Sequence, residues 1–171
     1  MNLRYISTLV AFSLILNISL IIAQNNKNSL SSHIDNIDST LVQSVNNFVD
    51  DWHSLASNAD LSYFDKIADN GIYIGTDATE LWNKEEFIQW SRKYFKRGNA
   101  WSFDTIERNV YFSKDKQYAW FDELLYTSMG VCRASGVLHK DNISWKIEHY
   151  HLSITIPNEN IEEVKKVISK E

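Results

Sequence analysis

The sequence predicts an α+β domain in which N-terminal helices pack against a curved antiparallel sheet. Apolar residues recur at helical spacing early in the folded region, between residues 41 and 56. Four strand-like segments then follow one another from residue 101 to residue 156, separated by short polar connections. Helices that precede an unbroken run of strands are typical of an α+β arrangement and not of alternating βα units.

The first two helices are predicted from apolar stripes. The longer one begins at a capping residue, Asp38 or Ser39. Its apolar face contains Leu41, Val45, Phe48, Val49, Trp52, Leu55 and Ala56. A short second helix opens at Asp60 and ends at Gly71, with Leu61, Phe64, Ile67 and Ala68 facing inward. Residues 72–74 are predicted to form a brief strand, which a loop follows.

The third helix is predicted over residues 84–96, because Asn83 and Glu86 form a capping pair at its start. The long strands are predicted at residues 101–112, 118–127, 131–139 and 144–156, and Pro157 ends the last of them. A final amphipathic helix follows, with Ile161, Val164 and Ile168 facing inward.

The N-terminal segment is predicted to be a secretory signal over residues 1–23, because a short basic start precedes an apolar run and a small residue. A membrane anchor is the alternative, but the apolar run of about 17 residues is short and interrupted by polar side chains. A polar tether over residues 24–37 and the domain over residues 38–171 complete the organisation. We therefore expect export to a periplasmic or extracellular location, without membrane association after cleavage.

Composition excludes several classes of function. The net charge is −5 and becomes −6 once the signal is removed, because Arg4 is the one charged residue within it. An acidic chain without a basic patch argues against binding to nucleic acid or to anionic lipid. Cys132 is the single cysteine, so no internal disulfide can form. The sequence has no phosphate loop, nucleotide motif or HExxH motif, and no cofactor or metal is expected.

The last strand carries the leading candidate site. Strict alternation would place Trp145, Ile147, His149, His151 and Ser153 on one face. Two histidines and a serine beside apolar side chains are typical of the polar wall of an apolar pocket. His151 is the first candidate for a general acid or base, and His149 and Ser153 are candidate ligand contacts. The alternative is a histidine that a neighbouring strand satisfies structurally.

Paired charges on the middle strands form a second candidate group. Asp122 and Glu123 are adjacent, so one faces inward and the other outward. Desolvation of the inward carboxylate would make it a candidate general acid or base. Arg108 and Arg133 are candidate ligands for an anionic substrate group, or alternatively partners of these carboxylates in structural ion pairs.

Loop and aromatic residues complete the candidate pocket. Glu80 and Trp82 precede the third helix and are positioned to cover a pocket mouth, and Asp77 is expected to form an Asx-type turn there. Trp120 and Trp145 are candidate ligand contacts. Further aromatic residues that line the cavity or belong to the core are Trp52, Tyr63, Tyr73 and Trp101.

Four segments carry a resemblance to a known family. They are IGTDATELW at residues 74–82, AWFDELL at 119–125, CRASGVLHK at 132–140 and WKIEHYHLSITIPNE at 145–159. Together with the order of elements they resemble the SnoaL-like branch of the nuclear transport factor 2-like superfamily, in its exported bacterial form. The last segment also resembles the association domain of calcium/calmodulin-dependent protein kinase II. Two positions depart from the family pattern: Leu81 stands where an arginine is common, and Ala134 where a glycine is common.

The resemblance implies a cone-shaped fold with a pocket, and usually a homodimer formed through the sheet. It implies no single activity. Three functions stay open: a binder of a small, mostly apolar molecule; a cofactor-independent isomerase, dehydratase or hydrolase that uses His151 with Asp122 or Glu123; and a non-catalytic dimeric interaction module.

Overall fold

The computed structural model describes residues 24–27, 38–142 and 144–169. The predicted signal and most of the predicted tether lie outside the described residues, so export stays a prediction. Residues 24–27 form an exposed helical turn. The chain divides into two compact units, Met1–Gln43 and Ser44–Glu171, and the fold below is that of the second unit. Among the described residues, no helix is long and apolar enough to cross a membrane.

The long helix spans residues 38–57, and its predicted apolar face is half-buried at Phe48 and Leu55. Val45, Val49, Trp52 and Ala56 are fully or almost fully buried against the sheet and its neighbours. The short second helix is a 3-10 helix, η1 (Leu61–Lys66), in which the Asp60 side chain accepts a hydrogen bond from the amide of Ser62. Leu61, which was predicted to face inward, is exposed.

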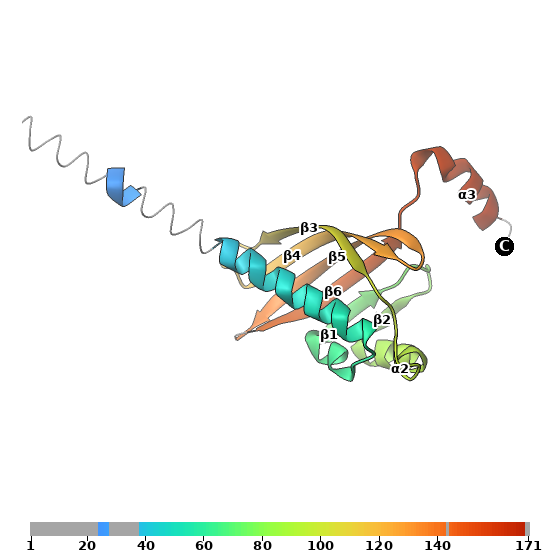
Figure 1. Cartoon of the computed structure of the whole chain (residues 1–171), viewed down its shortest axis with the longest axis horizontal. Helices are drawn as coiled ribbons and strands as arrows, with labels where there is room; N and C mark the ends of the chain where they lie inside the picture. Colours follow the sequence, from blue (N-terminus) through green and yellow to red (C-terminus); the bar gives the residue numbers. More distant parts are fainter. Residues whose placement is uncertain (1–23, 28–37, 143, 170–171) are drawn as a thin grey trace, which may run out of the picture. The chain divides into compact units, whose positions relative to one another are not determined.

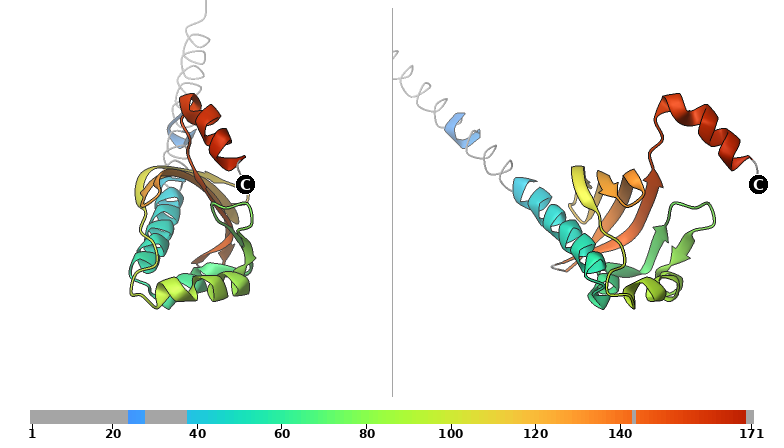
Figure 2. Two further views of the ribbon diagram at one scale, coloured as in Figure 1. Left: turned by 90° about the vertical axis from the view of Figure 1, so that its right-hand side faces the viewer. Right: turned by 45° about the vertical axis from the view of Figure 1, so that its right-hand side comes forward.

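Helix α2 (Lys84–Phe95) confirms the predicted capping pair. The Asn83 side chain accepts from the amide of Glu86, and the Glu86 carboxylate accepts from the amide of Asn83. Both orphan amides at the helix start are thereby satisfied. Figure 2 shows α2 along the base of the curved sheet and the long helix along one side of it.

The helices pack against a six-stranded sheet with the strand order β2-β1-β6-β5-β4-β3 (Figure 1). Its strands are β1 (Ile67–Ile74), β2 (Leu81–Asn83), β3 (Asp104–Phe112), β4 (Tyr118–Thr127), β5 (Gly130–Asp141) and β6 (Ser144–Ile154). The predicted α+β fold with a curved sheet is confirmed, and the four long strands pair antiparallel as predicted. The one difference is that β1 pairs with β6 in parallel, which makes the sheet mixed. The long connection between these two strands allows that direction. Strand β2 was predicted as loop, and it pairs only with the end of β1.

A β-bulge in β6 corrects the face assignment of the last strand. Ile147 pairs with Leu138, but His149 pairs with Val137, so Glu148 is an extra residue in the ladder. An extra residue reverses the alternation beyond it. Trp145 and Ile147 therefore face the interior together with Tyr150 and Leu152. The outer face instead carries His149, His151 and Ser153, which were predicted on the same face as Trp145.

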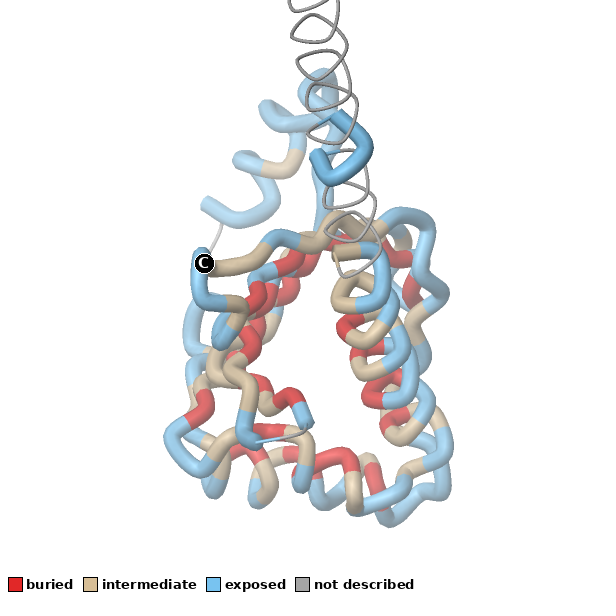
Figure 3. Tube along the Cα trace, turned by 90° about the vertical axis from the view of Figure 1, so that its left-hand side faces the viewer, coloured by how far each residue is buried: buried red, intermediate tan, exposed pale blue. Residues whose placement is uncertain are grey.

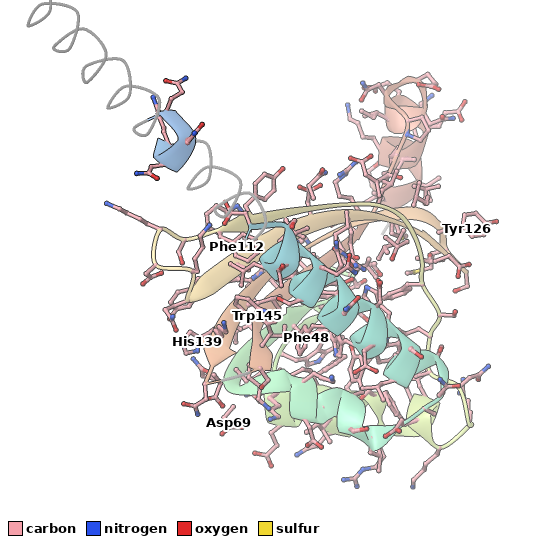
Figure 4. All side chains as sticks on the ribbon, turned by 60° about the vertical axis from the view of Figure 1, so that its left-hand side comes forward. Phe48, Asp69, Phe112, Tyr126, His139 and Trp145 are labelled. Carbon is pink, nitrogen blue, oxygen red and sulfur yellow. The ribbon has the colours of Figure 1, made fainter. Side chains whose placement is uncertain are left out.

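The inner side of the sheet and the helices enclose one aromatic core. Figure 3 shows buried stretches along the inner side of the strands and of the long helix. Figure 4 shows Phe48, Phe112 and Trp145 on the side that the long helix covers, and Tyr126 at the other end of the sheet with its ring turned away. The final helix, α3 (Ile161–Ile168), contains no buried residue, so its predicted inward residues are corrected: Ile161 and Ile168 are exposed and Val164 is half-buried.

Gly136 should tolerate no side chain, because a buried ring occupies the space above it. A Cβ at Gly136 would lie 2.5 Å from Cε1 of Phe121, whose side chain is itself enclosed by the core. We expect Gly136→Ala to lower the free energy of unfolding by about 1–3 kcal/mol in urea denaturation, as overpacking does. The outward neighbour provides the control, and Ser135→Ala should change stability by less than about 0.5 kcal/mol. If the two substitutions lowered the free energy of unfolding equally, the Phe121 ring would not be what excludes a side chain at Gly136.

Candidate functional site

A cavity of about 280 Å³ opens where the end of β1, helix α2 and the β4–β5 turn meet. Its wall is largely aromatic. The lining residues are Tyr73, Gly75, Thr76, Glu80, Trp82, Trp90, Tyr94, Ala100, Trp101, Phe103, Ser128, Met129 and Leu152. Larger depressions lie elsewhere on the surface, but one follows η1 and α2 on the outside, and another is lined mainly by hydroxyl and carboxylate side chains. The aromatic cavity is therefore the concave site best suited to an organic ligand.

The aromatic wall is built from rings that support one another. The Trp82 and Trp90 rings lie 4.4 Å apart between centroids, and the Trp101 ring meets Tyr94 edge-on at 6.3 Å. Behind them Tyr73 stacks on the fully buried Phe87 at 3.9 Å. Tilted and edge-to-face contacts of this kind stabilise each ring by about 0.5–1.5 kcal/mol beyond burial. The cavity is thus pre-formed, with its rings fixed by packing.

Glu80 brings a carboxylate to the rim of this cavity. The predicted Asx-type turn is confirmed, because Oδ1 of Asp77 accepts a hydrogen bond from the amide of Thr79 at 2.8 Å. The turn directs the chain back so that the Glu80 carbonyl accepts from the amide of Gly75 at 2.9 Å. The Glu80 side chain packs directly over Gly75, where any Cβ would collide with it. Its Oε2 accepts a hydrogen bond from the amide of Asp77 at 3.2 Å.

A second group of charges lies inside the fold, around Glu123 of β4. This carboxylate has no exposed surface. Its Oε2 accepts from Nε of Arg108 at 2.9 Å, and its Oε1 accepts from the Tyr150 hydroxyl at 3.2 Å. Nε2 of His53 lies 2.9 Å from Oε1 and must carry the proton, because an ionised carboxylate only accepts. Arg108 continues to Asp50 on the long helix at 2.8 Å.

The electrostatics of this cluster favour an ionised Glu123. Burial raises the pKa of Glu123, but the hydrogen bond from His53 and the charges of His53 and Arg108 outweigh burial, so its pKa lies below the ordinary 4.5. Burial raises the pKa of Tyr150 well above its ordinary value, and the charge of Glu123 raises it further. The cluster therefore contains a negative carboxylate whose partners are all in place.

The Glu123 cluster and the aromatic cavity are separate. Glu123 does not line the cavity. The rings of Tyr73 and Tyr150, whose centroids lie 5.3 Å apart, pack between the cluster and the cavity. The sequence alternative of an ion pair between Glu123 and Arg108 is present in the structure. His53 was missed as a site residue. It lies four residues after Val49, next to the buried stripe of the long helix, and this position was the signal that could have found it.

The structure places most other predicted site residues outside the cavity. Asp122 faces outward, where its Oδ1 accepts from Arg133 and from Asn109, both at 3.2 Å. His151 also lies on that outer face, 3.0 Å from the Ser153 hydroxyl.

Trp120 and His149 lie on one row of the outer face, since each is the neighbour of Val137 on an adjacent strand. Trp145 faces inward at the start of β6, where its Nε1 donates to the Ser44 hydroxyl at 3.1 Å. Of the residues predicted at the pocket, Glu80, Trp82, Tyr73 and Trp101 line the cavity. Sequence reasoning missed Trp90, Tyr94 and Met129 as lining residues.

No group of three or more histidine, cysteine or acidic side chains in the described part of the chain is placed to hold a metal ion.

Comparison with known proteins places these features in a family. A family model described as SnoaL-like domain matches residues 45–157. A comparison with curated proteins finds no match.

Solved structures show the same fold. An NTF2-like protein of unknown function from Pseudomonas putida is 12% identical, with a TM-score of 0.58 over 69% of this chain and 89% of that one. A Novosphingobium aromaticivorans protein provisionally assigned as scytalone dehydratase is 10% identical, with a TM-score of 0.58 over 70% and 89%. A Xanthomonas campestris protein provisionally assigned as a calcium/calmodulin-dependent protein kinase II association domain is 20% identical, with a TM-score of 0.51 over 67% and 86%. Identities this low show the fold alone.

The Glu123 cluster predicts a specific pH dependence of stability. Because the folded pKa of Glu123 lies below 4.5, its ionised form stabilises the fold above about pH 4.5, and this contribution is lost as the pH falls through the folded pKa. We expect Glu123→Gln to lower the free energy of unfolding by about 3–5 kcal/mol at pH 7, as loss of one partner of a buried pair does. The difference from the unmodified protein should shrink in urea denaturation at lower pH.

The control for this experiment is Asp122→Asn, the adjacent and partly exposed carboxylate that pairs with Arg133. A surface pair of this kind contributes about 0–1 kcal/mol. If Glu123→Gln cost no more than Asp122→Asn at pH 7, the buried network would not be the stabilising element described here.

Proposed function

The chain belongs to the SnoaL-like domain family, and we propose that it uses this fold to bind a small, mostly apolar molecule in the aromatic cavity. The observation that supports the proposal is the wall itself. Trp82, Trp90, Tyr94 and Trp101 present pre-packed rings to a concave space, and pockets for organic ligands are typically lined in this way. A volume of about 280 Å³ suits a ligand of roughly ten to fifteen heavy atoms at most.

The chemistry of the wall favours binding over proton transfer. Neither histidine nor arginine lines the cavity among the described residues, and Glu80 is the single carboxylate at its rim. The carboxylates of Asp122 and Glu123, which were the predicted acid or base, are engaged with Arg133 and Arg108. A general base must reach the proton it takes, and the Glu123 carboxylate lies behind packed rings.

We further propose that the protein is a homodimer formed through the outer face of the sheet. Apolar side chains gather on that face and remain exposed to solvent. Trp120 and Tyr111 stack at 6.0 Å while remaining nearly half exposed, and Tyr126 and Val131 are also exposed. Exposed apolar patches of this kind mark protein interaction sites. A two-fold interface would bring the same patch of each copy together.

Removing a ring from the cavity wall should weaken ligand binding selectively. With indole as probe in isothermal titration calorimetry, we expect Trp90→Leu to raise the Kd about tenfold, since a lost ring contact is worth about 1.4 kcal/mol. Tyr118→Leu removes an exposed ring outside the cavity and should leave the Kd unchanged. The proposal fails if indole and other neutral aromatic probes of this size do not bind, or if both substitutions weaken binding equally.

A charge on the outer face should separate the dimer. We expect Trp120→Glu to convert a dimer into a monomer in size-exclusion chromatography with light scattering, because the carboxylate would be buried unpaired in the interface. Leu61→Glu places the same charge on another exposed apolar position, in η1, and should leave the dimer intact. A monomeric unmodified protein, or dissociation by both variants, would exclude this interface.

A further inference from the structure

The aromatic cavity contains one charged side chain among its described lining residues, and that charge is negative. Glu80 supplies it, and no lysine, arginine or histidine lines the cavity. The wall therefore combines several electron-rich rings with a single negative charge. A purely apolar ligand would contact the rings but would leave the Glu80 carboxylate without a counter-charge.

The Glu80 carboxylate lacks a positive partner among the residues that the structure describes. Its one described polar contact is the hydrogen bond that Oε2 accepts from the amide of Asp77 at 3.2 Å. Packing over Gly75 holds the side chain at the rim and restricts other orientations. A half-buried carboxylate without a counter-charge is costly, and a cation in the cavity would remove that cost.

The aromatic rings of the wall also favour a positively charged ligand. Aromatic faces carry a negative quadrupole that attracts cations within about 6 Å, with Trp the strongest. Rings of this wall already attract cations: Nζ of Lys93 lies 4.9 Å from the Tyr94 centroid and 5.7 Å from that of Trp90, and the Arg97 guanidinium lies 5.4 Å from Tyr94. Neither Lys93 nor Arg97 lines the cavity itself.

The charge of Glu80 also acts on Tyr73, one ring of the cavity wall. Burial raises the pKa of Tyr73 far above its ordinary value of 10, and the negative charges of Glu80 and Glu123 raise it further, against the hydrogen bond with Tyr63. Tyr73 lines the cavity, so the charge of Glu80 acts on this part of the wall. A positive head group would be stabilised where a second anion would be repelled.

We propose that the cavity binds a small quaternary ammonium compound, with its positive head group between Glu80 and the rings of Trp82, Trp90 and Trp101. This inference rests on the proposed ligand-binding function and specifies its ligand class. A quaternary head group has no N–H donors, so it needs no hydrogen-bond acceptors from a wall that is mostly aromatic. Its methyl groups bury apolar area against the rings while its charge compensates Glu80.

Choline and its neutral carbon isostere, 3,3-dimethylbutan-1-ol, test the charge without changing the shape. Isothermal titration calorimetry on the full-length protein should show choline binding at least tenfold more tightly than the isostere. Glu80→Gln should weaken choline about tenfold and leave the isostere unchanged. Glu85→Gln, an exposed carboxylate in the first turn of α2, is the matched control and should alter neither.

The outcomes separate this inference from the proposed function. Equal or tighter binding of the isostere to the unmodified protein would overturn the cation assignment and leave a pocket for apolar molecules. Absence of binding for choline, the isostere and indole would overturn both. If Glu80→Gln did not fold, as judged by its thermal melting, the ratio of the two affinities on the unmodified protein would still decide between cation and apolar ligand.

Discussion

The charge network around Glu123, which includes Arg108 of the sheet and Asp50 and His53 of the long helix, joins the two layers of this fold. Glu123 lies on the inner face of β4 with no contact to solvent, and a lone charge there would not be tolerated. Arg108 on the neighbouring strand neutralises it and also reaches Asp50 on the long helix, while His53 of that helix binds the second carboxylate oxygen. The helix and the sheet are thus held in one register by charges as well as by apolar burial, and the cavity depends on that register because its floor belongs to the same core.

The bulge at Glu148 divides the functional surfaces of the sheet. It turns Tyr150 and Leu152 inward, where Tyr150 completes the Glu123 cluster and Leu152 reaches the cavity wall. The same reversal turns His149 and His151 to the outer face. Without the extra residue the two histidines would face the interior and the tyrosine would face solvent. One inserted residue thereby moves the polar side chains of β6 from the pocket to the proposed interface between copies.

The cavity is assembled from short pieces that lie far apart in the sequence. Glu80 and Trp82 come from the segment between β1 and α2, Trp90 from α2 itself, and Met129 from the β4–β5 turn. No single piece forms the cavity: residues 73–82 contribute five lining residues, and each of the other pieces contributes one to three. Their common property is aromatic or apolar character around one carboxylate, and this property appears only when the pieces converge.

The sequence by itself determined the order of the helices and the four long strands, the capping of α2 by Asn83 and Glu86, and the boundaries of β4, because local spacing and capping chemistry act within a few residues. It missed β2, and it extended the second helix to Gly71 although β1 begins at Ile67. It also identified Glu80 as a residue of the pocket mouth. The tertiary structure alone decided which faces were inside. A bulge depends on the neighbouring strand, so alternation in β6 could not reveal it. The parallel pairing of β1 with β6, and the partnership of His53 with Glu123 across 70 positions, likewise depend on how distant segments pack.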